Sequence, residues 1–132
     1  MIKLFEKFIN TNEENTRIEL LYVIHNLTIT CDPMKLLEFL LDNRDIIFLA
    51  ILNCLDVKNH TKLLILCLNT IEHWLKLGFT MALKLDKDSN EILEEFIQQE
   101  NIINLEILQN HPNSKISNKA NEIIETFLPI NE

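Results

Sequence analysis

Glycine and proline are scarce in this sequence of 132 residues. It has one glycine, Gly78, and three prolines, whereas Leu, Ile, Glu, Lys and Asn are abundant. Sheets joined by tight turns need more residues that tolerate a positive φ angle. A phosphate-binding loop needs several glycines. The scarcity therefore argues against a glycine-rich nucleotide loop and predicts an all-α fold.

Positive charge is also in short supply. Lys and Arg number 12 against 20 Asp and Glu, which gives a net charge of −8. Nucleic-acid phosphates and anionic membrane surfaces both attract clustered Lys and Arg. We therefore expect neither nucleic acid nor a membrane as a partner, and we expect a preference for basic partners.

Cysteines are few, and long apolar runs are missing. The three cysteines (Cys31, Cys54 and Cys67) lack CxxC spacing and sit beside aliphatic residues, which predicts buried, reduced thiols in a cytosolic or nuclear protein. The longest apolar run, residues 46–52, is too short to span a bilayer. Charges interrupt every apolar run of the first ten residues, so we expect no signal peptide.

The sequence contains no recognisable catalytic or metal-binding set. The four histidines are His25, His60, His73 and His111. Those on predicted helices, His25 and His73, have no Cys, His or Asp at a spacing typical of zinc ligands. Adjacent acids such as Glu94 and Glu95 point along different sides of a helix and are expected to be solvated. We predict that the protein is not an enzyme and needs no metal or cofactor.

Apolar residues recur at helical spacing, and short polar segments interrupt them. The pattern predicts helices near 2–10, 15–30, 33–42, 44–55, 60–84, 90–99, 101–110 and 114–128. Asp32 followed by Pro33 is typical of an N-cap with proline at the first helical position.

A unit of a short helix, a polar corner and a longer helix occurs three times. The corners lie about 45 to 55 residues apart, near the 40–47 typical of armadillo and HEAT repeats. One such pair cannot bury its own apolar face, so the pairs must stack. We therefore favour an armadillo-type α-solenoid over a four-helix bundle. It would be a right-handed superhelix of about three repeats in one domain, with repeats near 1–31, 32–88 and 89–132 and the first incomplete.

The segment ELLYVIHNLT, residues 19–28, has an unusual polar stripe. Its aliphatic residues cover one broad arc of the helix, expected to face the core, whereas Glu19, Tyr22 and Asn26 gather on nearly the opposite side. An exposed ring beside an amide and a carboxylate suits an extended basic peptide. An ordinary solvated face with one amphipathic tyrosine is the alternative interpretation.

Three segments of the chain resemble the importin-α (karyopherin-α) family. TRIELLYVIHNLT (16–28) is similar to the third helix of a late armadillo repeat, with Glu, an aromatic residue and Asn at matching positions. LDVKNHTKLLILCLNTIEHWL (55–75) is similar to the next repeat, and INLEILQNHPNSKISNKANEIIETFL (103–128) resembles the family's closing repeat.

The resemblance implies a nuclear import adaptor that shuttles between cytoplasm and nucleus. Glu19, Tyr22 and Asn26 would bind basic nuclear localisation signals at the family's minor site, with Tyr22 at the position of a tryptophan. His73 stands where the family tends to have asparagine and would be the weaker member of the site. The last repeat would bind a recycling exportin of the CAS type.

The sequence also departs from the family. It contains neither a basic importin-β-binding segment nor the repeats of the major cargo site, so importin-β is not an expected partner and we expect a fragment or reduced homologue. Tyr22 offers a smaller stacking surface than tryptophan. Trp74, next to His73, falls at a core position. A small helical-repeat scaffold that binds another protein without reading cargo is the alternative function.

Overall fold

The computed structural model describes residues 2–98 and 101–128 of the chain. Within these ranges the chain forms eight helices and no strand, so the all-α prediction is confirmed. The helices are α1 (Ile2–Asn10), α2 (Glu14–Thr30), α3 (Pro33–Asp42), α4 (Arg44–Cys54), α5 (Thr61–Lys84), α6 (Glu91–Gln98), α7 (Asn101–Leu108) and α8 (Ser114–Phe127). Each predicted helix is present with its ends within two residues of the prediction, except that residue 99 lies outside the described ranges.

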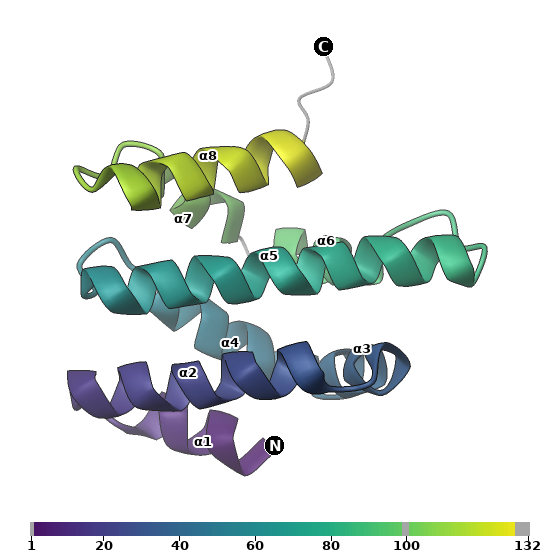
Figure 1. Ribbon diagram of the computed structural model, residues 1–132, viewed down its shortest axis with the longest axis horizontal. Coiled ribbons are helices and arrows are strands. Elements are labelled where there is room, and N and C mark those ends of the chain that lie inside the picture. Colours follow the sequence, from purple (N-terminus) through teal and green to yellow (C-terminus); the bar gives the residue numbers. More distant parts are fainter. Residues whose placement is uncertain (1, 99–100, 129–132) are drawn as a thin grey trace.

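The long helices lie side by side in one layer (Figure 1). Helices α2, α5 and α8 run in the same direction, and α5 contacts both of the others. Behind them lie α1, α4 and α7, and α4 contacts both α1 and α7. The expected repeat limits at 31–32 and 88–89 fall in the connections that follow α2 and α5. The described chain is therefore all-helical and repeat-like.

Local sequence signals explain where several helices begin. The Asp32 side chain accepts the N–H of Lys35 at 3.2 Å, and Pro33 is the first residue of α3, as predicted. His60 has the same role at α5, where its Nδ1 accepts the N–H of Lys62 at 3.1 Å. No helix of the described residues is both long enough and apolar enough to cross a membrane.

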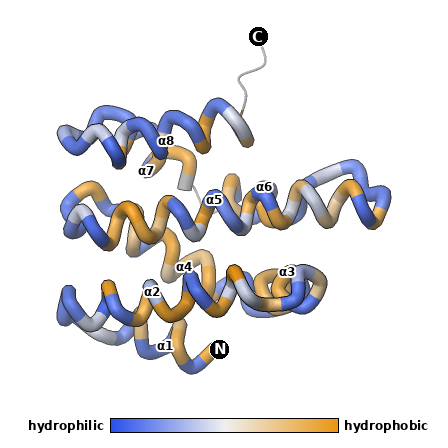
Figure 2. Tube along the Cα trace, viewed as in Figure 1, coloured by the Kyte–Doolittle hydropathy of each residue, from blue (hydrophilic) through white to orange (hydrophobic). Residues whose placement is uncertain are grey.

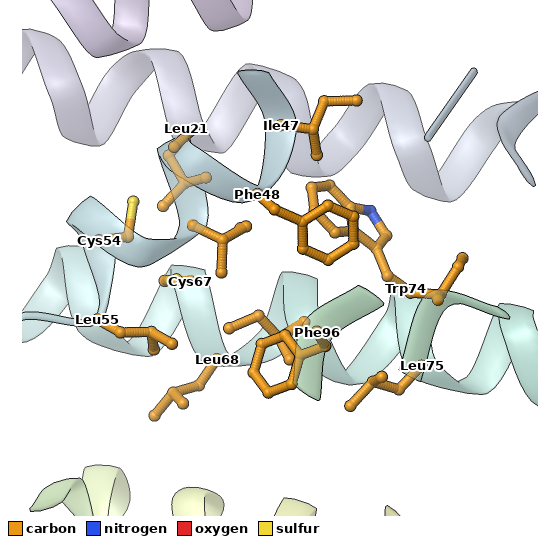
Figure 3. Packing of buried hydrophobic residues seen from close by; sticks show 14 of the residues in the cluster. Leu21, Ile47, Phe48, Cys54, Leu55, Cys67, Leu68, Trp74, Leu75 and Phe96 are labelled. Carbon is orange, nitrogen blue, oxygen red and sulfur yellow. The ribbon is translucent and has the colours of Figure 1, made fainter. Parts of the chain in front are cut away.

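The core lies between the two layers (Figure 3). Leu21 of α2, Phe48 of α4, Trp74 of α5 and Phe96 of α6 are all buried there. The prediction that Trp74 is a core residue is therefore confirmed, and its ring centroid lies 6.3 Å from that of Phe5. Burial of one such side chain stabilises the fold by about 1.5–3 kcal/mol.

The predicted apolar arc of α2 is only partly buried. Leu21 and Ile24 are in the core, but Val23 is 44% exposed and Leu27 is 40% exposed. The helical repeat places these two residues about 160° around the helix from His25, which contacts α5. The expectation that the whole arc faces the core was wrong because only the part of the arc towards the second layer and α5 is covered.

Two of the three cysteines meet the expectation of buried thiols. Cys54 and Cys67 are buried and unoxidised, whereas Cys31 at the end of α2 is only half-buried, so the prediction fails for that residue. Burial, together with a hydrogen bond to Cys54, raises the pKa of the Cys67 thiol well above its ordinary value. The Cys67 thiol is therefore protonated at neutral pH.

The expectation that Glu95 is solvated was wrong. Its side chain is only 7% exposed, and Arg44 Nη1 lies 3.1 Å from its Oε1. Arg44 begins α4, so this ion pair connects α4 with α6. A carboxylate on the inner side of α6 is tolerated because the guanidinium replaces its lost hydration.

Candidate functional site

Glu19, Tyr22 and Asn26 form an exposed row on α2, which we call the α2 stripe. All three are exposed, and Tyr22 is exposed by 56%. Spacings of three and four residues make them neighbours on one helix face, because such pairs have Cβ atoms about 5–6 Å apart. That face lies opposite the buried Leu21 and Ile24.

The side chains of the α2 stripe have no partner within the part of the chain that the structure describes. None of the three makes a side-chain hydrogen bond or an ion pair there. The stripe therefore presents a flat ring, an amide that both donates and accepts, and a carboxylate to whatever approaches α2. A lysine or arginine stem can lie on the ring, and the amide matches the N–H and C=O groups of an extended backbone.

The fourth predicted residue, His73, lies on α5 and is half-buried. It is not a member of the α2 stripe. It lines a pocket that begins at Thr28 and Ile29, less than one helical turn beyond Asn26. The predicted site residues thus occupy two adjacent features, the stripe and the pocket.

His25 connects the two helices that carry these features. The Thr70 hydroxyl donates to the carbonyl of Leu66 at 2.8 Å, so it must accept its second hydrogen bond, 3.0 Å long, from His25 Nδ1–H. Burial lowers the pKa of His25, and the nearby His73 lowers it further. This hydrogen bond connects the side chains of α2 and α5 next to the pocket.

The acidic side chain of α5 nearest to this region is already paired. Glu72 Oε1 lies 3.2 Å from Lys119 Nζ of α8 and 4.0 Å from Lys76 Nζ. Its charge is therefore largely balanced within the protein. Glu19 of the α2 stripe has no such pairing in the described residues, so it is the carboxylate available to a cation on this side of α2.

Sequence reasoning missed the pocket between α2, α3 and α5, which we call the α2–α5 pocket. Its volume is about 230 Å³. The apolar residues that line it are Ile29, Cys31, Pro33, Leu36, Leu77 and Met81. The polar residues that line it are Thr28, His73, Lys76, Thr80 and Lys84. The spacing from His73 to Lys84 would have placed these α5 residues on one helix face, but only the fold brings the end of α2 and the start of α3 to them.

Helix α2 contains both hydrophobic and hydrophilic residues along its length (Figure 2). The tube is orange in the apolar centre of α2 and largely blue along α8. Across the described residues, no three His, Cys, Asp or Glu side chains gather closely enough to hold a metal ion. The residues of the α2 stripe and of the pocket offer apolar contacts, hydrogen bonds and charge to a ligand.

No protein-family model and no curated protein matches this sequence.

Proposed function

We propose that this chain is a short armadillo-type solenoid that binds an extended, basic peptide of a partner protein on the α2 stripe. It would act as a nuclear import adaptor of the importin-α type. The observation that carries this proposal is the joint exposure of Glu19, Tyr22 and Asn26 on the face of α2 opposite the core. The side-by-side arrangement of α2, α5 and α8 supports the repeat architecture.

Each residue of the stripe has a defined role in this binding. The Tyr22 ring carries the aliphatic stem and cationic head of a lysine or arginine, worth about 0.5–1 kcal/mol at an exposed site. Asn26 holds the peptide backbone through its amide, which adds about 0.5–1.5 kcal/mol. Glu19 attracts the basic residue through its charge, so binding weakens as salt rises.

The resemblance to the importin-α family extends the proposal to the other end of the chain. There α7 and α8 would bind the recycling exportin, and the protein would shuttle between nucleus and cytoplasm. Basic peptides reach the protein easily because its net charge is −8.

A scaffold function without cargo binding is the second candidate, and one observation favours it. Trp74, the aromatic residue next to His73 on α5, is buried and offers no ring to a peptide. The α2 stripe is therefore not continued by an equivalent aromatic row on α5. A protein-interaction module that binds through another surface would need no such row.

A peptide titration separates the two functions. A fluorescein-labelled peptide with two basic clusters is titrated with the wild type and with Tyr22→Ala/Asn26→Ala. We expect salt-sensitive binding that is about tenfold weaker in the double variant, because both the ring and the amide are removed. The matched control is Ile103→Ala/Ile107→Ala, which changes two exposed apolar residues of α7, on a different helix from the stripe.

The outcomes are distinct. Equal affinity of the wild type and the Tyr22→Ala/Asn26→Ala variant would show that the stripe is not the binding site. Absence of binding to all three proteins would favour the scaffold function. An equal loss in the control would show that the effect is not specific to the stripe.

A further inference from the structure

The α2–α5 pocket has an apolar floor and a cationic rim. Leu36, Leu77 and Met81 are buried beneath it. Lys76 and Lys84 are both exposed at its edge, and His73 lies beside them. No carboxylate is among the residues that line it. This combination suits an apolar group that carries, or stands next to, a negative charge.

Two acids flank lining residues in the sequence, Asp32 and Glu72, but neither lines the pocket. Asp32 keeps its charge and caps α3, where its carboxylate accepts the Lys35 N–H. Glu72 lies 4.0 Å from Lys76 but only 3.2 Å from Lys119, which draws its charge towards α8. Lys84 has no ion pair among the described residues. The charged residues that line the pocket are therefore both lysines, and Lys76 shares Glu72 with Lys119.

The size of the pocket limits what can occupy it. Pockets for drug-sized ligands have volumes of about 300–1,000 Å³, whereas this one has about 230 Å³. One apolar side chain of a peptide fits such a volume. The carboxylate of an adjoining residue would then lie over the lysines at the rim.

The pocket also continues the α2 stripe. Seven residues separate Tyr22 from Ile29, which is about 10 Å along the helix axis. An extended peptide covers that distance with about three residues. A single peptide can therefore contact the stripe and fill the pocket.

We propose that the α2–α5 pocket binds an apolar residue and an adjoining acidic residue of the same extended peptide whose basic residue lies on the α2 stripe. This inference rests on the proposed peptide-binding function and specifies its ligand. The peptide is mixed in charge, with a basic residue about three positions from an apolar–acidic pair. Lys76 and Lys84 bind the carboxylate, and they repel a peptide that is basic throughout.

The test uses fluorescein-labelled, amidated peptides with two lysines, a two-residue serine spacer and a Leu-Glu pair, made in both chain orders. Matched peptides carry Leu-Gln or Ser-Glu instead. With the wild type, Leu-Glu should bind about five- to tenfold more tightly than Leu-Gln, because two partly exposed lysines each contribute up to about fivefold. Ser-Glu should lose about as much, because the apolar floor is left without a partner.

Charge-neutralised variants locate the effect. In Lys76→Gln/Lys84→Gln the preference for Leu-Glu over Leu-Gln should fall to about one. The control Lys62→Gln/Lys115→Gln removes the same charge from exposed positions outside the pocket and should keep the preference. Tyr22→Ala should weaken all three peptides equally and leave the preference unchanged.

Failure of this inference is distinguishable from failure of the proposed function. Equal binding of Leu-Glu and Leu-Gln, with a loss in Tyr22→Ala, would overturn the pocket assignment and keep the stripe. A Leu-Glu preference that survives in Tyr22→Ala without any loss of affinity would support the pocket and overturn the stripe. If no peptide of either order binds below about 1 mM, both assignments are wrong.

Discussion

Replacing Gly78 by alanine should destabilise the protein, although alanine is the better helix former. Gly78 lies inside α5 and has no positive φ angle, so its backbone does not require glycine. A Cβ atom on this residue would, however, lie 2.0 Å from Asn90 Oδ1 and 2.8 Å from Asn90 Cγ. Contacts this short do not occur, so the Asn90 side chain would have to move.

The expected loss follows from what Asn90 does. Its Oδ1 accepts the N–H of Leu93 at 3.0 Å, which caps α6, and its Nδ2 donates to the carbonyl of Leu75 at 3.0 Å. Loss of an N-cap costs about 0.5–2 kcal/mol, and loss of the second hydrogen bond costs about 0.5–1.5 kcal/mol. Alanine recovers about 0.5–1 kcal/mol of helix propensity. Gly78→Ala should therefore lower the free energy of unfolding by about 1–2 kcal/mol.

Urea unfolding followed by circular dichroism measures this in a double-mutant cycle. Asn90→Ala removes the atoms that clash, so adding Gly78→Ala to that variant should raise the free energy of unfolding by about 0.5–1 kcal/mol. The sign of the glycine substitution thus reverses between the two backgrounds. Stabilisation in both backgrounds, or an equal loss in both, would refute the assignment of the close approach to Asn90.

Two further predictions concern buried charge and pH. Arg44→Met should lower the free energy of unfolding, measured in urea, by about 1–2 kcal/mol, which is less than for a fully buried pair because Arg44 is half-exposed. The double variant Arg44→Met/Glu95→Met should recover most of this loss, because it leaves no unpaired carboxylate. An unchanged stability of Arg44→Met would contradict this. Burial holds the pKa of His25 below its ordinary value of 6.5. As the pH falls, the unfolded chain therefore binds a proton at His25 at a higher pH than the folded protein does. The free energy of unfolding should be largest above about pH 6.5 and should decrease as the pH falls towards the folded-state pKa. Urea unfolding of the wild type and His25→Gln above and below pH 6.5 measures this slope, and an equal slope in both would count against His25 as its source.

The helices were predictable because their signals are local. Apolar spacing follows the helical repeat, and the Asp32–Pro33 pair sets the start of α3 through atoms only a few residues apart. The exposure of Tyr22 and Asn26 was predictable for the same reason, because a helical wheel places each of them about 160° from the buried Ile24. No knowledge of the neighbouring helices was needed for these conclusions.

The remaining features depend on which helices meet, and the sequence alone does not reveal this. Val23 and Leu21 lie at the two ends of one aliphatic arc about 160° wide, and only the position of the other helices decides that the end with Leu21 is covered and the end with Val23 is not. Glu95 is one of two adjacent acids, and its burial follows from Arg44, which is 51 residues away in the chain. The single glycine is conspicuous in the sequence, yet its reason lies in Asn90 at the next corner.

In the proposed binding mode, net charge alone is a poor guide to which peptide would bind. The overall charge of −8 attracts any basic peptide over distances up to about a Debye length, roughly 8–10 Å, and so raises the rate of encounter. Once the peptide is in contact, the nearest side chains decide which segment binds. Glu19 then favours a cation on the stripe, whereas Lys76 and Lys84 favour an anion at the pocket.

These two scales predict different salt dependences for peptides of different charge. For a peptide of mixed charge, salt screens favourable contacts at both the stripe and the pocket, so affinity falls throughout. For a uniformly basic peptide, salt weakens the contact with Glu19 but also screens repulsion from Lys76 and Lys84. Its affinity should therefore depend less on salt than its larger charge suggests.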